Sequence, residues 1–189
     1  MRSTSKLRII GGDWRGRTLG FTARDGLRPT PDRVRETLFN WLAPRIRGAT
    51  CLDMFAGSGA LGLEALSRGA QSCDFIETSR PAAQAIQGHL QLLQATARGQ
   101  VINADTFTLK RTNQYDIVFI DPPFAEQLQA RAVTWLLDNN MLAEDARIYR
   151  EFSQQDPEPA LDARTSVLKD KKAGHVRYQL LAVATQGVD

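Results

Sequence analysis

Residues 52–62 read "LDMFAGSGALG", and this stretch decides the fold. A short apolar run ends at Asp53. Gly57, Gly59 and Gly62 then follow with the spacing G-x-G-x-x-G, before an apolar helical pattern begins. Glycines at these places let the backbone turn sharply, approach a ligand and pack a helix closely on a strand. The stretch therefore predicts the strand, turn and helix that open a parallel α/β sheet.

The neighbouring stretches continue an alternation of strands and helices. The apolar pattern predicts strands at 50–55, 72–78, 99–105, 115–121 and 146–152, and helices at 59–70, 80–95 and 125–140. Ser79 is expected to cap the second of these helices. Such an alternation predicts an α/β fold whose sheet is mostly parallel and covered by helices on both faces. The segments 165–170 and 175–183 predict a closing pair of strands.

The first 48 residues show a different pattern. Two apolar runs broken by glycines between residues 7 and 21 predict a β-hairpin, and residues 34–42 carry apolar side chains at helical spacing. Thr30 is expected to cap this helix, with Pro31 as its first residue. We expect a hairpin-and-helix extension at 1–48 and a second part at 49–189, with a boundary weak enough that both could form one domain.

The composition indicates a soluble globular protein. Apolar residues make up 42% of the chain and charged residues 24%, which are ordinary values. No apolar run is long enough to cross a membrane, and the N-terminus lacks the apolar core of a signal peptide, so a cytoplasmic location is expected. Cys51 and Cys73 lie in apolar runs and are expected to be buried free thiols. His89 and His175 are expected to be structural or solvated, since no His or Cys spacing suggests a metal site.

Acidic residues stand at the ends of predicted strands. Asp53, Glu77, Asp105 and Asp121 each lie at the end of one strand. The carboxyl ends of parallel strands meet at one edge of a sheet, and ligands of such folds bind there. One acid at such a place is a turn residue, but four acids at the same edge predict a binding site.

The glycine turn and the acids narrow the class of ligand. Glu77 lies 20 residues after Gly57, where an acid accepts hydrogen bonds from ribose hydroxyls. Both NAD and S-adenosylmethionine carry such a ribose. A carboxylate at Asp53 would repel a pyrophosphate but suits the ammonium group of S-adenosylmethionine, and Asp105 could accept from an adenine amino group. These two acids favour S-adenosylmethionine as the cofactor.

The strand at 115–121 leads into "DPPF", residues 121–124. The amino group of a nucleobase is a poor nucleophile because its lone pair is delocalised into the ring. The Asp121 carboxylate and the Pro122 carbonyl are two acceptors that would localise this lone pair, while Pro122 and Pro123 remove competing N–H donors. Phe124 could stack on the base. We expect these residues to hold a target amino group for in-line methyl transfer.

Four segments carry a resemblance to a known family. They are "RIIGGDWRGRTL" at 8–19, "LRPTPDRVRETLFNWL" at 27–42, "LDMFAGSGALGLEALSRGA" at 52–70 and "DIVFIDPPF" at 116–124. The chain resembles bacterial small-subunit ribosomal RNA guanine-N2 methyltransferases of the RsmD type, over nearly its whole length. The resemblance implies a Rossmann-like, class I S-adenosylmethionine-dependent methyltransferase that modifies one guanine of 16S ribosomal RNA.

The resemblance also implies roles for single residues. The cofactor would be held by Asp53, Gly57, Gly59 and Glu77, with Phe55 and Asp105 beside them, and the target base by Asp121, Pro122, Pro123 and Phe124. Members of the family often carry a second acid where this chain has Ser79. This difference implies a lower cofactor affinity, or a Ser79 that serves mainly as a helix cap.

Charge is unevenly distributed along the chain. Residues 1–47 hold 11 Lys and Arg against 4 Asp and Glu, whereas the remaining residues hold 13 against 17. A basic arm on a mildly acidic body predicts a polyanionic partner, here 16S ribosomal RNA or the small ribosomal subunit.

The candidate RNA contacts are Arg15, Arg17, Arg28, Arg33 and Arg35. Arg33 and Arg35 cannot share one helix face, so at least one should point away from RNA. Trp14 is expected either to stack on an unpaired base or to be half-buried.

Other interpretations stay open at this point. The "DPPF" pattern also fits enzymes that methylate adenine N6 in DNA or RNA, or glutamine N5 in proteins. The glycine turn alone fits an NAD-dependent oxidoreductase, and the basic arm alone fits a non-catalytic RNA-binding protein. No membrane or metal partner is expected, and the expected state is a monomer.

Overall fold

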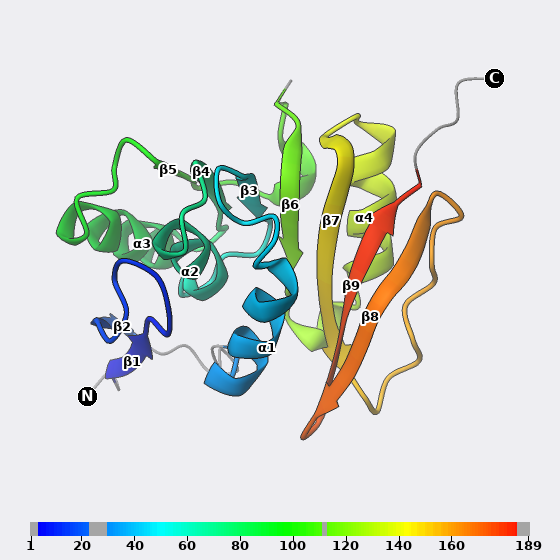
Figure 1. Ribbon diagram of the computed structural model, residues 1–189, viewed down its shortest axis with the longest axis horizontal. Helices are drawn as coiled ribbons and strands as arrows, with labels where there is room; N and C mark the ends of the chain where they lie inside the picture. The colour runs from blue at the N-terminus through cyan, green and yellow to red at the C-terminus, as the bar shows by residue number, and fades with distance from the viewer. Residues whose placement is uncertain (1–3, 23–29, 111–112, 185–189) are drawn as a thin grey trace.

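The computed structural model describes residues 4–22, 30–110 and 113–184, and a seven-stranded sheet runs through it (Figure 1). The strand order is β5-β4-β3-β6-β7-β9-β8. The bounds are β3 Thr50–Asp53, β4 Ser72–Ile76, β5 Gly99–Ile102, β6 Tyr115–Ile120, β7 Leu142–Ser153, β8 Thr165–Ala173 and β9 Val176–Val183. Strands β5, β4, β3, β6 and β7 are parallel, whereas β9 is antiparallel to β7 and β8. The predicted mostly parallel sheet is confirmed, and the predicted closing pair forms its antiparallel edge.

Helices cover both faces of this sheet (Figure 1). They are α1 Asp32–Leu42, α2 Ala60–Ser67, α3 Arg80–Leu92 and α4 Gln129–Asp138. Helices α1, α2 and α3 share one core with sheet residues such as Phe75 and Phe119, and α4 shares the other core with Val118 and Ile148. Successive residues of a strand point to opposite faces, so the central strands carry apolar side chains throughout.

The starts of α3 and α4 show how local sequence sets helix boundaries. Ser79 caps α3 as expected, because its hydroxyl accepts from the N–H of Ala82 at 3.4 Å, and Pro81 occupies the first turn. Helix α4 begins at Gln129, later than the predicted residue 125. The residues between form a short 3₁₀-helix, η2 Phe124–Glu126, which follows the two prolines.

The predicted N-terminal hairpin is confirmed. Strands β1 (Thr4–Arg8) and β2 (Thr18–Thr22) pair antiparallel as a separate two-stranded sheet. The hairpin buries its apolar side chains in the same core as α1, α2 and α3, and these side chains are Leu7, Ile9, Leu19 and Phe21. The parts on either side of residue 48 therefore share one hydrophobic core.

The carboxylate of Glu64 on α2 joins the hairpin to the rest of the molecule. This side chain is fully buried, and its two oxygens accept from the backbone N–H groups of Ile10 and Gly11 at 2.9 and 2.8 Å. Arg68 donates to Oε1 at 2.7 Å, and the Arg35 guanidinium lies 3.6 Å from Oε2. Because a buried charge is stable only among donors and opposite charges, these contacts fix the hairpin, α1 and α2 to one another.

A close backbone approach strengthens this junction. Gly12 has φ +75°, and a Cβ atom there would lie 1.9 Å from the carbonyl oxygen of Ser67. The N–H of Asp13 donates to the same carbonyl at 2.8 Å. Only glycine fits between the hairpin loop and the end of α2.

The polar and sulfur side chains in the cores behave largely as expected. Cys51 and Cys73 are buried free thiols. His89 is buried, and its Nε2 lies 2.9 Å from the carbonyl oxygen of Gly20, which ties α3 to β2. Among the residues that the structure describes, no helix has the length and apolar character to span a membrane.

The Glu64 junction predicts a large effect on stability. Glu64→Ala would leave two N–H groups and a buried guanidinium without their carboxylate. We expect a loss of about 3–5 kcal/mol in the free energy of unfolding, measured by urea denaturation. Glu36→Ala removes an exposed acid of α1 and is the matched control, with an expected change within about 0.5 kcal/mol. Similar small losses in both variants would show that the junction does not hold the hairpin.

Candidate active site

The parallel strands bring the predicted acids to one edge of the sheet. Asp53 is the last residue of β3, Glu77 follows β4, and Asp121 follows β6. The carboxylates of Asp121 and Glu77 are both close enough to act on the charge of Asp53. Asp105 stands at the same edge after β5, where it is exposed and its Oδ1 accepts from the N–H of Phe107 at 2.9 Å. The expected convergence of acids at the carboxyl edge is present.

The glycine turn is fixed by Glu77. Its Oε2 accepts from the N–H of Gly57 at 2.8 Å, and its Oε1 accepts from the N–H of Ser79 at 2.7 Å. Gly57 and Gly59 have φ of 53° and 78°, which side chains would strain. At Gly62, an added Cβ would lie 2.2 Å from the Phe75 ring, so α2 packs closely on β4. These contacts fix the shape of the turn, and Ser79 contributes a backbone donor to Glu77 as well as the α3 cap.

Asp53 is the most deeply buried of these acids. It is 2% exposed, and its Oδ2 accepts from the N–H of Gly62 at 3.1 Å. Burial, together with the charges of Asp121 and Glu77 and against the opposing Gly62 hydrogen bond, raises the pKa of Asp53 to about 7. A carboxyl group in this setting gains most from a ligand that brings a positive charge. This fits the ammonium group of S-adenosylmethionine better than the pyrophosphate of NAD.

Aromatic side chains stand beside these acids. The Phe55 and Phe107 rings meet edge to face at 6.3 Å, and Phe107 meets Trp135 at 6.0 Å in the same manner. The Arg131 guanidinium lies 3.8 Å from the centre of the Phe107 ring. Phe55 was a predicted cofactor residue, whereas Phe107 was missed, although it stands two residues after Asp105. The cluster forms an apolar surface beside the acidic edge.

Asp121 is oriented by a residue of the N-terminal segment. The hydroxyl of Thr30 donates to its Oδ2 at 2.9 Å. The prediction that Thr30 caps α1 is therefore wrong, because α1 begins after Pro31 without a side-chain cap and the hydroxyl serves Asp121 instead. Burial raises the pKa of Asp121 to about 6, and the Thr30 hydrogen bond opposes this shift. The carboxyl group therefore remains mostly ionised at neutral pH and can accept hydrogen bonds.

The rest of the "DPPF" segment is only partly described. Pro122 is buried and Pro123 is exposed. Both have no N–H, so neither extends the ladder of β6. The backbone of Phe124 opens η2, and its side chain lies outside the described part of the structure.

The predicted RNA-binding arginines occupy different environments. Arg15 and Arg17 are exposed between β1 and β2, and Arg33 is exposed in the first turn of α1. Arg28 lies outside the described residues. Trp14 is half-buried and packs against the core, with the Arg98 guanidinium 5.8 Å from its ring centre.

Arg35 requires a correction. Its side chain is 1% exposed, so it is not available to contact RNA. Its Nη2 donates to Asp32 at 2.6 Å and to the carbonyl of Arg8 at 2.8 Å, and its Nε donates to the carbonyl of Thr30 at 3.2 Å. Helical spacing turns Arg35 toward the core and leaves Arg33 at the surface.

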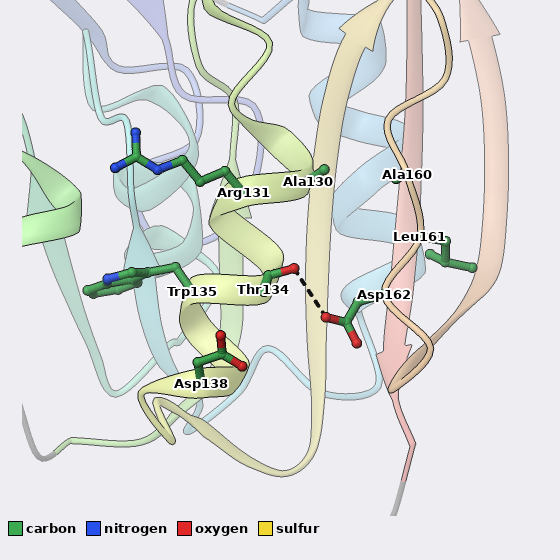
Figure 2. Close-up of a pocket in the computed structure, with 8 residues that line it drawn as sticks. All are labelled: Ala130, Arg131, Thr134, Trp135, Asp138, Ala160, Leu161 and Asp162. Atoms are coloured by element: carbon green, nitrogen blue, oxygen red, sulfur yellow. Dashed lines mark hydrogen bonds between the residues drawn. The ribbon is translucent and has the colours of Figure 1, made fainter.

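A surface groove of about 480 Å³ lies apart from the acidic edge, between α4 and residues 160–162 (Figure 2). Thr134 donates to Asp162 across it at 3.1 Å. Arg131 and Trp135 point together away from Asp162, on the side where they contact Phe107 (Figure 2). None of the strand-end acids lines this groove, so we assign the candidate site to the acidic edge. Within the described ranges, no group of three His, Cys, Asp or Glu side chains could hold a metal ion.

Comparisons with known proteins agree with this geometry. The sequence model of a family described as "Conserved hypothetical protein 95" matches residues 7–182. The chain is 48% identical over 185 residues to "Ribosomal RNA small subunit methyltransferase D" of Escherichia coli K12, covering 97% of this chain and 93% of the relative. It is 44% identical over 180 residues to the protein of that name from Haemophilus influenzae, covering 93% of each. The solved structure "Putative methyltransferase yhhF from Escherichia coli" superposes with a TM-score of 0.87 at 43% identity, over 96% of this chain and 100% of that one.

The environment of Asp53 predicts how cofactor affinity varies with pH. If the ionised carboxylate binds an ammonium group, affinity for S-adenosylmethionine should rise as pH increases through the pKa of about 7. It should fall again above about pH 8, where an α-amino group loses its charge. Calorimetric titration between pH 6 and 9 would measure both limbs.

Two variants sharpen this measurement. Asp53→Asn should lose the acid limb and bind roughly tenfold to hundredfold more weakly, because a charge-assisted hydrogen bond is removed. Asp105→Asn removes an exposed acid at the same edge and should keep the acid limb. A wild-type affinity that does not vary between pH 6 and 7.5 would exclude the ammonium contact at Asp53.

Proposed function

The chain belongs to the family described as conserved hypothetical protein 95, and we propose that it transfers a methyl group from S-adenosylmethionine to the N2 amino group of one guanine in 16S ribosomal RNA. Two curated relatives that cover more than nine tenths of the chain are named as small-subunit ribosomal RNA methyltransferases. The observation that carries the proposal is the pairing of a buried acid, Asp53, with the Asp121-Pro122 turn at one sheet edge. This pairing supports a site for a cationic cofactor next to acceptors for an amino group.

The chain's own residues bind and orient the reactants. S-adenosylmethionine supplies a methyl group bonded to a positively charged sulfur. The glycine turn and Glu77 would face its ribose, and Asp53 its ammonium group. The fit rests on the positive φ of Gly57 and Gly59 and on the burial of Asp53.

Asp121 and Pro122 prepare the amino group. Thr30 occupies one lone pair of Asp121 Oδ2 and fixes the carboxylate, so Oδ1 is directed to the substrate. Hydrogen bonds from the amino group to Asp121 and to the Pro122 carbonyl localise the nitrogen lone pair toward the methyl carbon. As the N–C bond forms and the S–C bond breaks, the nitrogen gives up one proton, which Asp121 can accept and pass to water. Positioning and electrostatics supply the rate enhancement.

The target base must leave a helical stack to reach this edge. An amino group inside an RNA helix cannot enter a site that lies at the end of a buried strand, so the guanine would be splayed from a loop or flipped out. A protein that acts on ribosomal RNA would work in the cytoplasm, in agreement with its buried free cysteines.

RNA would be held by cations outside the acidic edge. Arg33 is exposed in the first turn of α1, three residues after Thr30. Arg15 and Arg17 extend this basic surface over the hairpin loop. A second set of exposed cations, Lys171 and Lys172, lies near the β8–β9 turn, at the same sheet edge as Asp121 because Val176 pairs with Ser153 at the end of β7.

The role of Asp121 predicts a separation of rate from binding. Asp121→Ala should lower the single-turnover rate of methyl transfer to unmodified small ribosomal subunits by roughly tenfold to hundredfold. Affinity for S-adenosylmethionine should be unchanged or slightly tighter, because the Asp121 charge raises the pKa of Asp53. Glu126→Ala removes an exposed acid from the same segment and should keep the wild-type rate. Wild-type turnover in Asp121→Ala would contradict the assignment.

The hairpin predicts a change in salt dependence. Changing Arg15 and Arg17 together to Ala should weaken RNA binding and make its salt slope less steep by roughly 0.7 per lost phosphate contact. Cofactor affinity should stay the same. Filter binding at several salt concentrations would measure the slope, with a Lys171→Ala, Lys172→Ala double variant as the comparison. If the salt slope changes only in the lysine variant, the RNA contact would be assigned to the β8–β9 hairpin instead.

A further inference from the structure

A second buried acid, Glu151, stands beside Asp121. Ile120 of β6 pairs in parallel with Arg150 of β7, so Asp121, the residue after β6, stands beside Glu151 of β7 at about the 4.8 Å spacing of neighbouring strands. They share the sheet face of α1 because Phe119 and Tyr149, two residues earlier on each strand, both lie in the α1 core. Glu151 is 4% exposed.

The contacts of Glu151 hold it in place without neutralising it. The hydroxyl of Tyr149 donates to Oε2 at 2.7 Å, and Gln129 donates to the backbone carbonyl of Glu151 at 2.8 Å. Burial raises the pKa of Tyr149 well above its ordinary value of 10, so this hydroxyl stays a donor. The neighbouring Arg150 points to the opposite face, where its Nε donates to Gln179 at 2.8 Å.

In the part of the chain that the structure describes, the groups that face Glu151 from other elements are acidic or neutral. Asp121 faces it from β6, and Asp53 stands beyond Asp121 on β3. Tyr178 is its partner on β9, and Thr30 reaches Asp121 from the start of α1. A buried carboxyl group and a half-buried one at neighbouring positions, with no cation beside them among the described residues, cannot both ionise at low cost. Burial and the charge of Asp121 raise the pKa of Glu151. Glu151 is more deeply buried than the half-buried Asp121, so its charged form is the costlier of the two.

We propose that Glu151 is a positioning residue for methyl transfer, which holds the one proton shared by the two carboxyl groups and so keeps Asp121 ionised and oriented. Because Oε2 accepts from Tyr149, Oε1 is the oxygen that would carry the proton and donate it toward Asp121. Asp121 then keeps its charge for the hydrogen bonds to the substrate amino group. When Glu151 ionises, repulsion between its carboxylate and that of Asp121 disturbs the position of Asp121 at the carboxyl edge of the sheet. The positioning role rests on the proposed function, whereas the shared proton does not.

The shared proton can be tested on the protein alone. The folded chain keeps the proton of Glu151 between its ordinary pKa, near 4.5, and its raised value, whereas the unfolded chain releases it. The stability that this carboxyl group contributes is therefore lost as pH rises through that window, by up to tenfold in the unfolding constant per pH unit. Glu151→Gln keeps an acceptor for Tyr149 and removes the titration.

Urea denaturation of wild type and Glu151→Gln at pH 5, 7 and 9 gives this result directly. We expect the unfolding constant of wild type, divided by that of the variant, to increase by at least about tenfold from pH 5 to pH 9. Glu144→Gln, which changes an exposed acid of the same strand, is the matched control. A ratio that is constant with pH, or that only follows the control, would overturn the proposal.

The positioning role is tested by the pH profile of the rate. With saturating S-adenosylmethionine and unmodified small ribosomal subunits, the single-turnover rate of wild type should rise as Asp121 ionises and fall as Glu151 ionises. Glu151→Gln should keep the acid limb and lose the alkaline limb. Equal loss of rate at every pH would show a merely structural role and overturn the proposal. If a titrating group of the substrate caused the alkaline limb, wild type and Glu151→Gln would show the same alkaline limb in their rates.

Failure of the proposed function gives a different pattern. If wild type transfers no methyl group to the subunits, the proposed function and the positioning role are both overturned. The unfolding constant of wild type divided by that of Glu151→Gln, followed from pH 5 to pH 9, still decides whether Glu151 holds the proton.

Discussion

The buried carboxylate of Glu64 holds together segments that are far apart in the sequence, and the orientation of Asp121 depends on it. Glu64 accepts from the hairpin loop and faces the guanidinium of Arg35. Arg35 in turn donates to the carbonyl of Thr30, and the hydroxyl of Thr30 donates to Asp121. A continuous series of charged and hydrogen-bonded contacts thus runs from the core of α2 to the end of β6. The N-terminal segment therefore supports the site as well as carrying the basic surface.

The carboxyl edge concentrates acids that burial drives toward the protonated state. Asp53, Asp121 and Glu151 all have raised pKa values, and burial is the first cause in each case. Such an arrangement costs stability as pH rises, because the unfolded chain releases these protons more readily. A cationic cofactor relieves this cost on binding. The same acids repel a polyanion, which explains why cations for RNA would lie on separate elements, the hairpin and the start of α1.

Much of the fold and part of the site follow from local sequence. Strand and helix positions agree with the apolar pattern because the spacing of apolar residues along each element reflects which of its sides is buried. The acids Asp53, Glu77, Asp105 and Asp121 could be assigned to one edge since parallel strands must end together. The N-terminal hairpin and the Ser79 cap depend on neighbouring residues alone, and both were predicted.

The partners of these residues were decided only by the tertiary structure. Nothing near Arg35 in the sequence shows that Glu64 would draw it into the core, and Thr30 resembled a helix cap until the fold brought Asp121 beside it. Glu151 sits within an ordinary strand pattern, and its neighbour Asp121 is fixed by the register of β6 on β7. The sequence by itself determined which elements form and which acids end the strands, because those depend on residues a few positions apart. Which charges are buried, and against which partner, depends on contacts between segments tens of residues apart, so only the folded chain decides it.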